Sequence, residues 1–186
     1  MYKMSIARKL FREAYKDCHL RIGQTDEEEF YVTGKDWLMW FDAACMEKEI
    51  KGELISLCGD LPKPGTAYLA LPASGQQMEV LRDDLIPSGD TGQKAYNATR
   101  FFYSKNKQIG TVVWSNEASR MMIIDNRALI LIQPDEKEII TGPIAAGRYL
   151  CWKGDGRAFY VMEWSRGEDD DEVERFLSAL EKGWLR

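Results

Sequence analysis

Seven strand-like segments follow one another closely in the second half of the chain, and this spacing limits the possible folds most strongly. They span residues 97–103, 109–114, 120–124, 128–132, 138–141, 149–152 and 157–164. Their connections are short and turn-like, as at 104–107 and 153–156. Because a parallel crossover needs a dozen residues or more, such connections force antiparallel pairing. The pattern predicts an antiparallel β-meander.

Residues 33–58 have the pattern of one long helix. Thr33 and Asp36 have the spacing of a capping box, and Gly59 is a typical residue just after a helix end. The part over 37–46 is apolar nearly all round, so it must be covered on all sides. We expect the sheet to curve around this apolar half of the helix, since both faces of several strands also need cover.

Three further helices are expected from apolar spacing. The first starts at Ser5 and ends at Gly23, and a shorter one starts at Ser74 and includes Leu85. The C-terminal helix has an apolar stripe at i, i+3, i+4, i+7 and i+11. That stripe consists of Val173, Phe176, Leu177, Leu180 and Trp184.

The predicted fold class is therefore α+β: a curved antiparallel β-meander packed around a long apolar helix, with additional N- and C-terminal helices. The chain has 186 residues, of which 45% are hydrophobic, and it shows neither an internal repeat nor a low-complexity linker. This size suits one domain. We expect a single domain over 1–186, with a helical part over about 1–60 and a β-rich part with the C-terminal helix over about 61–186.

Composition argues against several classes of protein. The net charge is −5, whereas a general nucleic-acid binder carries the opposite sign. The longest apolar runs, 121–124 and 128–132, are far shorter than a membrane span, and no secretory signal is recognisable. The four cysteines are widely separated, which favours buried thiols in a reducing compartment. We therefore expect a cytoplasmic protein without a membrane partner.

Motifs for catalysis and for metal or cofactor binding fail on inspection. The single histidine, His19, and the absence of a C-x-x-C pair argue against a zinc site or a histidine-based triad. Residues 142–149 (GPIAAGRY) resemble a phosphate loop but have Arg148 where lysine is required. The D-T-G triplet starting at Asp90 has polar neighbours and no second copy, unlike an aspartic protease. The sequence predicts no catalytic residue, metal or cofactor, so an enzyme is the less favoured interpretation.

The first 22 residues sum to a charge of +4, because they contain six basic and two acidic side chains. Arg8, Arg12 and Lys16 have helical spacing i, i+4, i+8 and form one possible basic contact for phosphate or for an acidic partner. The alternative is an ordinary solvated helix face, since no aromatic residues are interleaved for base stacking.

The start of the C-terminal helix is strongly acidic. Six of the seven residues at 168–174 are acidic, more than a helix dipole requires, because the dipole effect fades after the first turn. Tryptophan is enriched at the energetic centres of interfaces. The predicted partner-binding residues are Glu168, Asp169, Asp170, Asp171, Glu172 and Trp184.

These observations favour a small non-catalytic protein-binding module. One specific form is an inhibitor of the mobile-element or anti-defence type, which occludes a nucleic-acid-handling partner through its acidic surface. The alternative is an enzyme or small-ligand-binding protein with a pocket at the mouth of the curved sheet. Its polar lining would be Arg100, Tyr103, Glu117 and Arg148.

Overall fold

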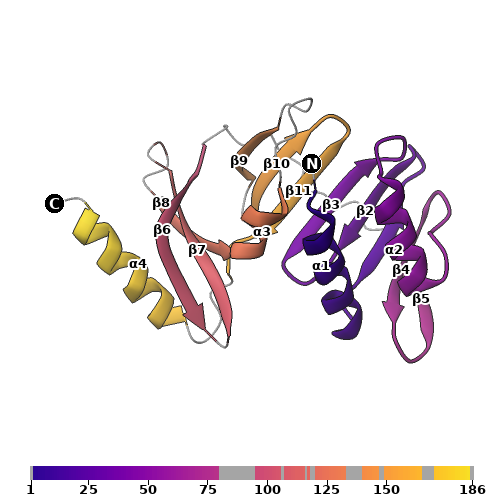
Figure 1. Ribbon diagram of the computed structural model, residues 1–186, viewed down its shortest axis with the longest axis horizontal. Coiled ribbons are helices and arrows are strands. Elements are labelled where there is room, and N and C mark those ends of the chain that lie inside the picture. Colours follow the sequence, from indigo (N-terminus) through magenta and orange to yellow (C-terminus); the bar gives the residue numbers. More distant parts are fainter. Residues whose placement is uncertain are drawn as a thin grey trace.

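A computed structural model shows a mixed α+β protein, as predicted (Figure 1). It describes residues 2–79, 95–105, 107–115, 117, 120–132, 140–146, 149–164 and 170–184. The D-T-G triplet at 90–92, Arg148, Glu168 and Asp169 lie outside the described residues.

The larger sheet has eight antiparallel strands in the order β5-β4-β1-β2-β3-β11-β10-β9. Its N-terminal strands are β1 (Arg21–Gln24), β2 (Glu29–Thr33), β3 (Trp37–Asp42), β4 (Thr66–Leu71) and β5 (Gly75–Glu79). Its C-terminal strands are β9 (Thr141–Ala146), β10 (Tyr149–Gly154) and β11 (Arg157–Met162). Pairing between β3 and β11 joins the two parts.

A second sheet contains three antiparallel strands in the order β6-β7-β8. The strands are β6 (Asn97–Lys105), β7 (Gln108–Ser115) and β8 (Arg120–Asp125). The short helix α3 (Asn126–Leu131) follows β8 directly, and Asp125 caps it by accepting a hydrogen bond from the Arg127 amide.

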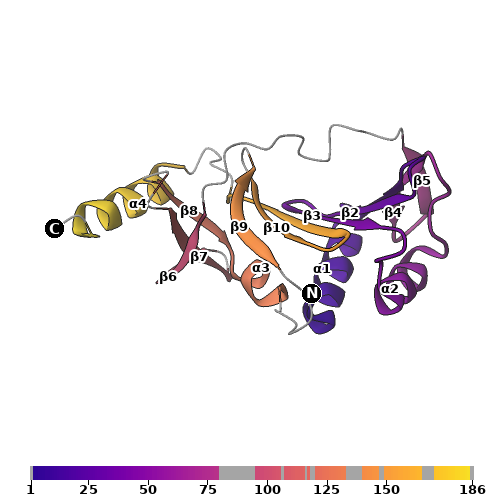
Figure 2. The same cartoon turned by 90° about the horizontal axis from the view of Figure 1, so that it is seen from above.

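Helices α1 (Met4–Lys16) and α2 (Lys48–Cys58) lie on the same face of the larger sheet (Figure 2). Helix α4 (Asp170–Trp184) lies beside the smaller sheet at the opposite end of the elongated molecule (Figure 1). Among the described residues, none of the helices is long and apolar enough to cross a membrane.

One hydrophobic cluster connects the two sheets. It contains Phe11 of α1, Ile50 of α2 and Phe159 of β11, together with Val113 and Met122 of the smaller sheet. The inner face of the smaller sheet therefore packs into the same core as the larger sheet, while its other face remains for α4.

The predicted long helix over 33–58 is wrong. Residues 37–42 form strand β3, and helix α2 is limited to Lys48–Cys58. Met39 and Phe41 face the helices, whereas Leu38 belongs to a separate cluster on the opposite face. Because both faces of β3 are apolar, the strand lacks the alternating pattern that would distinguish it from a buried helix. The helix end at Gly59 is correct, since Gly59 follows α2 with a φ of +86°.

Other predicted elements also differ. The first helix ends at Lys16, and Gly23 lies inside β1. Residues 75–79 of the helix predicted from Ser74 form β5 instead, and the predicted strand over 128–132 falls largely within α3. The prediction of a mostly helical segment over 1–60 is therefore incorrect, because this segment supplies three strands of the larger sheet. The antiparallel pairing predicted for the second half of the chain is present, but one continuous meander is wrong, since β6, β7 and β8 form the smaller sheet whereas β9, β10 and β11 belong to the larger one.

Candidate functional site

Helix α4 is anchored by the apolar stripe that its sequence predicted. Val173, Phe176 and Leu180 pack against the smaller sheet, and Leu177 is only 7% exposed. The sheet contributes Tyr103, Val112, Met121 and Ile123. The rings of Tyr103 and Phe176 lie 5.1 Å apart. This packing fixes which side of the helix faces outward.

The outward side of α4 is acidic in its first half. Asp171, Glu172 and Glu174 are exposed. Asp171 accepts a long hydrogen bond of 3.5 Å from Arg175, and both side chains are at least 80% exposed, so the pair adds little stability. Asp170 begins the helix and Trp184 ends it, but their side chains lie outside the described part of the structure.

Two neighbouring hollows extend this surface. An open hollow of about 610 Å³ is lined by Arg100 and Phe101 of β6 and by Ala179, Leu180 and Gly183 of α4. A second hollow, of about 480 Å³, runs along the exposed side of α4 and is lined by Asp171, Glu174 and Ala179 together with Arg175, Ser178 and Lys182. Ala179 lines both hollows, so the hollow with Asp171 and Glu174 adjoins the one with the half-exposed Phe101. We call Asp171, Glu172, Glu174 and Phe101 the α4 surface.

The residues of the alternative pocket occupy different environments. Arg100 lines the hollow beside α4, and Glu117 is exposed in the connection between β7 and β8. Tyr103 is buried beneath α4, where it also contacts the ring of Trp164. Tyr103 is thus used in packing, and a pocket built on these residues together with Arg148 stays a prediction.

The predicted basic contact lies on α1, next to α2. The Nε atoms of Arg8 and Arg12 lie 3.4 Å and 2.8 Å from the carboxylate oxygens of Glu53. Lys16 is exposed in the last turn of α1. Two of the three charges therefore share one carboxylate across the helix pair, which accounts for their spacing without a ligand.

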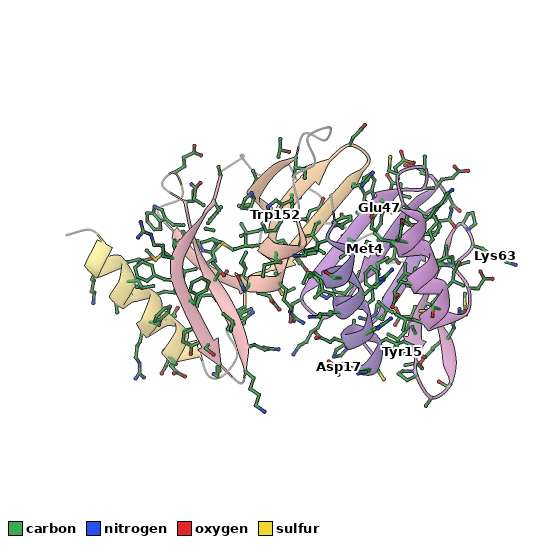
Figure 3. All side chains as sticks on the ribbon, viewed as in Figure 1. Met4, Tyr15, Asp17, Glu47, Lys63 and Trp152 are labelled. Carbon is green, nitrogen blue, oxygen red and sulfur yellow. The ribbon has the colours of Figure 1, made fainter. Side chains whose placement is uncertain are left out.

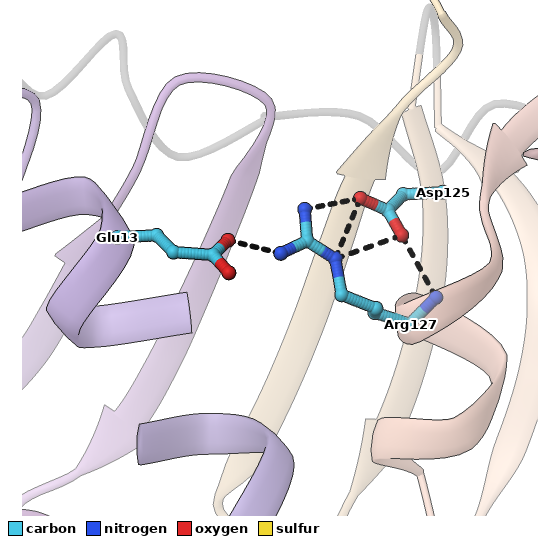
Figure 4. Close-up of polar contacts among 3 residues, drawn as sticks. All are labelled: Glu13, Asp125 and Arg127. Carbon is cyan, nitrogen blue, oxygen red and sulfur yellow. Dashed lines mark hydrogen bonds and ion pairs between the residues drawn. The ribbon is translucent and has the colours of Figure 1, made fainter. Parts of the chain in front are cut away.

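A third set of charged residues lies between α1 and the start of α3. The Arg127 guanidinium donates to both oxygens of Asp125, at 2.6 to 3.1 Å, and also to Glu13 (Figure 4). Hydrogen bonding to Asp125 raises the pKa of Arg127, so the guanidinium stays charged. The side-chain partner of Asp125 is therefore Arg127, two residues further along the chain. The D-N-R sequence at the start of α3 is a signal of helix capping that could have suggested this.

These side chains border a cleft of about 110 Å³ that the sequence did not predict. Its other charged or titratable lining residues are Asp17, His19, Lys35 and Asp36. Within the described residues, no group of three or more His, Cys, Asp or Glu side chains is arranged to hold a metal ion.

Comparisons with protein-family models, with curated proteins and with solved structures find no significant match to this chain.

Proposed function

We propose that this protein is a binding module whose α4 surface docks on a basic patch of a partner protein. The observation that carries this proposal is the orientation of α4. Its apolar stripe is occupied by the smaller sheet, so the acidic residues face outward, beside the half-exposed Phe101.

The composition of the α4 surface suits a protein interface. Interfaces typically place aromatic side chains at the centre and charged groups at a solvated rim. Here Phe101 borders the larger hollow and Asp171 and Glu174 line the adjoining one. Carboxylates at such a rim mainly raise the association rate with an oppositely charged partner.

A nucleic-acid-handling protein is the partner class that we favour, as predicted from the sequence. Such proteins display lysine and arginine where phosphates bind, and a row of carboxylates on α4 can occupy that place. Occlusion requires no chemistry of its own, so in this proposal the protein acts as an inhibitor rather than as an enzyme. We also propose a reducing compartment such as the cytoplasm, because all four cysteines are free thiols.

Affinity capture with matched variants tests the proposal. The tagged protein is passed through lysate at low and high salt, next to a variant with Asp171→Asn, Glu172→Gln and Glu174→Gln. The matched control removes three exposed acidic charges elsewhere, with Glu27→Gln, Glu49→Gln and Asp155→Asn.

We expect the wild type and the control to retain one protein in stoichiometric amount at low salt and to lose it at high salt. The α4 variant should bind that protein roughly tenfold more weakly, mainly through slower association, with an unchanged melting temperature. Equal retention by the α4 variant would refute the acidic surface, and an empty column for all three proteins would refute the binding module.

A further inference from the structure

The cleft between α1 and α3 has an apolar floor and a charged rim. Leu10 and Ala14 of α1 contribute to the floor, together with Trp37, Phe159 and Val161 of the larger sheet. The rim comes from three separate elements: the end of α1, the turn between β2 and β3, and the start of α3. Figure 3 shows Asp17 at the C-terminal end of α1, where the cleft is bordered by that helix.

The charges around the cleft do not balance. Four carboxylates line it, from Glu13, Asp17, Asp36 and Asp125, against two cations, from Lys35 and Arg127. With His19 neutral, the lining has a net charge of −2. The hydrogen bonds that the described Arg127 side chain donates go to Asp125 and Glu13, and none of them goes to Asp36 or Asp17.

Asp36 and Asp17 are the two carboxylates of the cleft that have no side-chain hydrogen bond or ion pair among the described residues, and Asp36 is the one next to Trp37. It is held in place by its backbone, because its carbonyl accepts a hydrogen bond of 2.8 Å from the amide of Met162. Among the described residues, its side chain makes neither a hydrogen bond nor an ion pair within 4 Å. Asp36 lies at the exposed rim of the cleft, and its pKa is raised, chiefly because neighbouring protein atoms displace part of the water around it; Lys35 opposes the shift, and the carboxylate of Asp125 adds to it.

Trp37, the next residue, offers an aromatic surface to the same cleft. Its indole lies directly over Gly34, where an added Cβ would come within 2.4 Å of Nε1. The ring of Phe11 lies 5.9 Å away on another side. These contacts fix the indole, and an organic cation is attracted both to such a ring and to a carboxylate.

We propose that this cleft is a binding site for an organic cation, an alkylammonium or guanidinium group, with Asp36 as its anchoring carboxylate and Trp37 as its aromatic wall. The cleft is small, with a volume of about 110 Å³, and this suits a cationic head group with a short stem. That chemistry occurs both on a free small amine and on a lysine or arginine side chain of a peptide.

The test is a titration followed by NMR, with the indole N–H of Trp37 and the amides of Gly34 and Asp36 as reporters. The probes are n-butylammonium and methylguanidinium, and the matched controls are n-butanol, which is neutral, and butyrate, which is anionic. We expect saturable shifts with the two cations only. Asp36→Asn should weaken binding roughly tenfold, since it removes the charge from the anchoring acceptor. Asp155→Asn removes an exposed charge outside the cleft and should leave binding unchanged.

The pH dependence of cation binding provides a second test. Binding should weaken as the pH falls through the raised pKa of Asp36, thus at a higher pH than for an ordinary aspartate. Lys35→Gln should strengthen binding, because it removes the cation that competes for Asp36. His19 lines the same cleft, so the pH profile is repeated in His19→Gln, which keeps the Asp36 carboxylate.

Capped lysine and arginine peptides distinguish the two sources of the cation. Binding at least as tight as that of the free cations indicates a peptide side chain, whereas weaker binding indicates a free small amine. The proposal is overturned if butanol or butyrate binds as well as the cations, or if Asp36→Asn binds normally. It is also overturned if no saturable shift is seen up to roughly 50 mM, well above the millimolar range of weak ligands. None of these outcomes depends on the α4 surface.

Discussion

Replacing Gly23 with alanine should destabilise the protein through a single steric conflict. Gly23 in β1 lies directly opposite Tyr31 in β2. A Cβ added at Gly23 would lie 2.1 Å from Cζ of Tyr31, whereas ordinary van der Waals contacts begin at 3.4 Å. Gly23 is not among the positive-φ residues, so alanine meets no backbone penalty there and the conflict is with the ring alone.

The expected cost follows from the burial of the ring. Tyr31 is 2% exposed, so the ring cannot move by more than an ångström without displacing packed neighbours. Overpacking of this kind costs roughly 2 kcal/mol. In a chain of 186 residues, this lowers the melting temperature by roughly 4–8 °C.

A double-mutant cycle separates the steric conflict from other effects. Urea unfolding is measured for Gly23→Ala, for Tyr31→Leu and for the double variant. With the smaller leucine at position 31, Gly23→Ala should lower the free energy of unfolding by less than about 0.5 kcal/mol. Nearly all of the destabilisation seen with tyrosine at position 31 should therefore appear as coupling energy between positions 23 and 31. An equal cost in both backgrounds, or an unchanged unfolding midpoint for Gly23→Ala, would refute the reasoning.

Two further predictions concern α4 and the thiols. Leu177→Ala should lower the free energy of unfolding by about 2–5 kcal/mol and expose the α4 amides to hydrogen exchange, because Leu177 is buried in the cluster that anchors the helix. The control variant Ser178→Ala, at an exposed neighbouring position, should change the free energy of unfolding by less than about 0.5 kcal/mol. Equal exchange in both variants would contradict this anchoring. At pH 8 a thiol reagent should modify the exposed Cys18 before the fully buried Cys151, since burial raises the pKa of Cys151 to about 11. Mass spectrometry of the modified peptides gives the order of modification. Equal rates for the two thiols would argue against the burial of Cys151.

The sequence predicted amphipathic elements well and fully buried ones poorly. Helices α1 and α4 each have one apolar face, and both were recognised from their spacing. In contrast, β3 is apolar on both faces. Of the predicted capping-box residues, Thr33 ends strand β2 and Asp36 lies in the β2–β3 turn, where the amide of Gly34 donates to the carbonyl of Trp37. Local patterns cannot distinguish these cases, because β3 is buried between the neighbouring β2 and β11, and β11 is more than a hundred residues away.

The charged cleft was missed for a related reason. Glu13, Asp36 and Arg127 lie on elements far apart in the sequence, and no local pattern relates any of them to the other two. Only the non-local packing of α1, the β2–β3 turn and α3 brings them together. The residues of the α4 surface on the helix itself were predictable, because one helix supplies them, whereas Phe101 joins them only through the packing of β6 against α4.

The chain has two strongly charged segments, a basic one over residues 1–22 and an acidic one over residues 168–174, and the fold uses their charges differently. Arg8 and Arg12 direct their charge onto Glu53 of α2, so part of the positive excess of the first 22 residues is used to join two helices. The exposed Asp171 of α4 pairs only weakly with Arg175, because the two charged atoms are 3.5 Å apart and both side chains are exposed. A solvated charge contributes little to stability, and a cluster of like charges opposes folding. Because Asp171, Glu172 and Glu174 are all exposed on the outward side of the helix, we assign partner binding to the α4 surface rather than to α1.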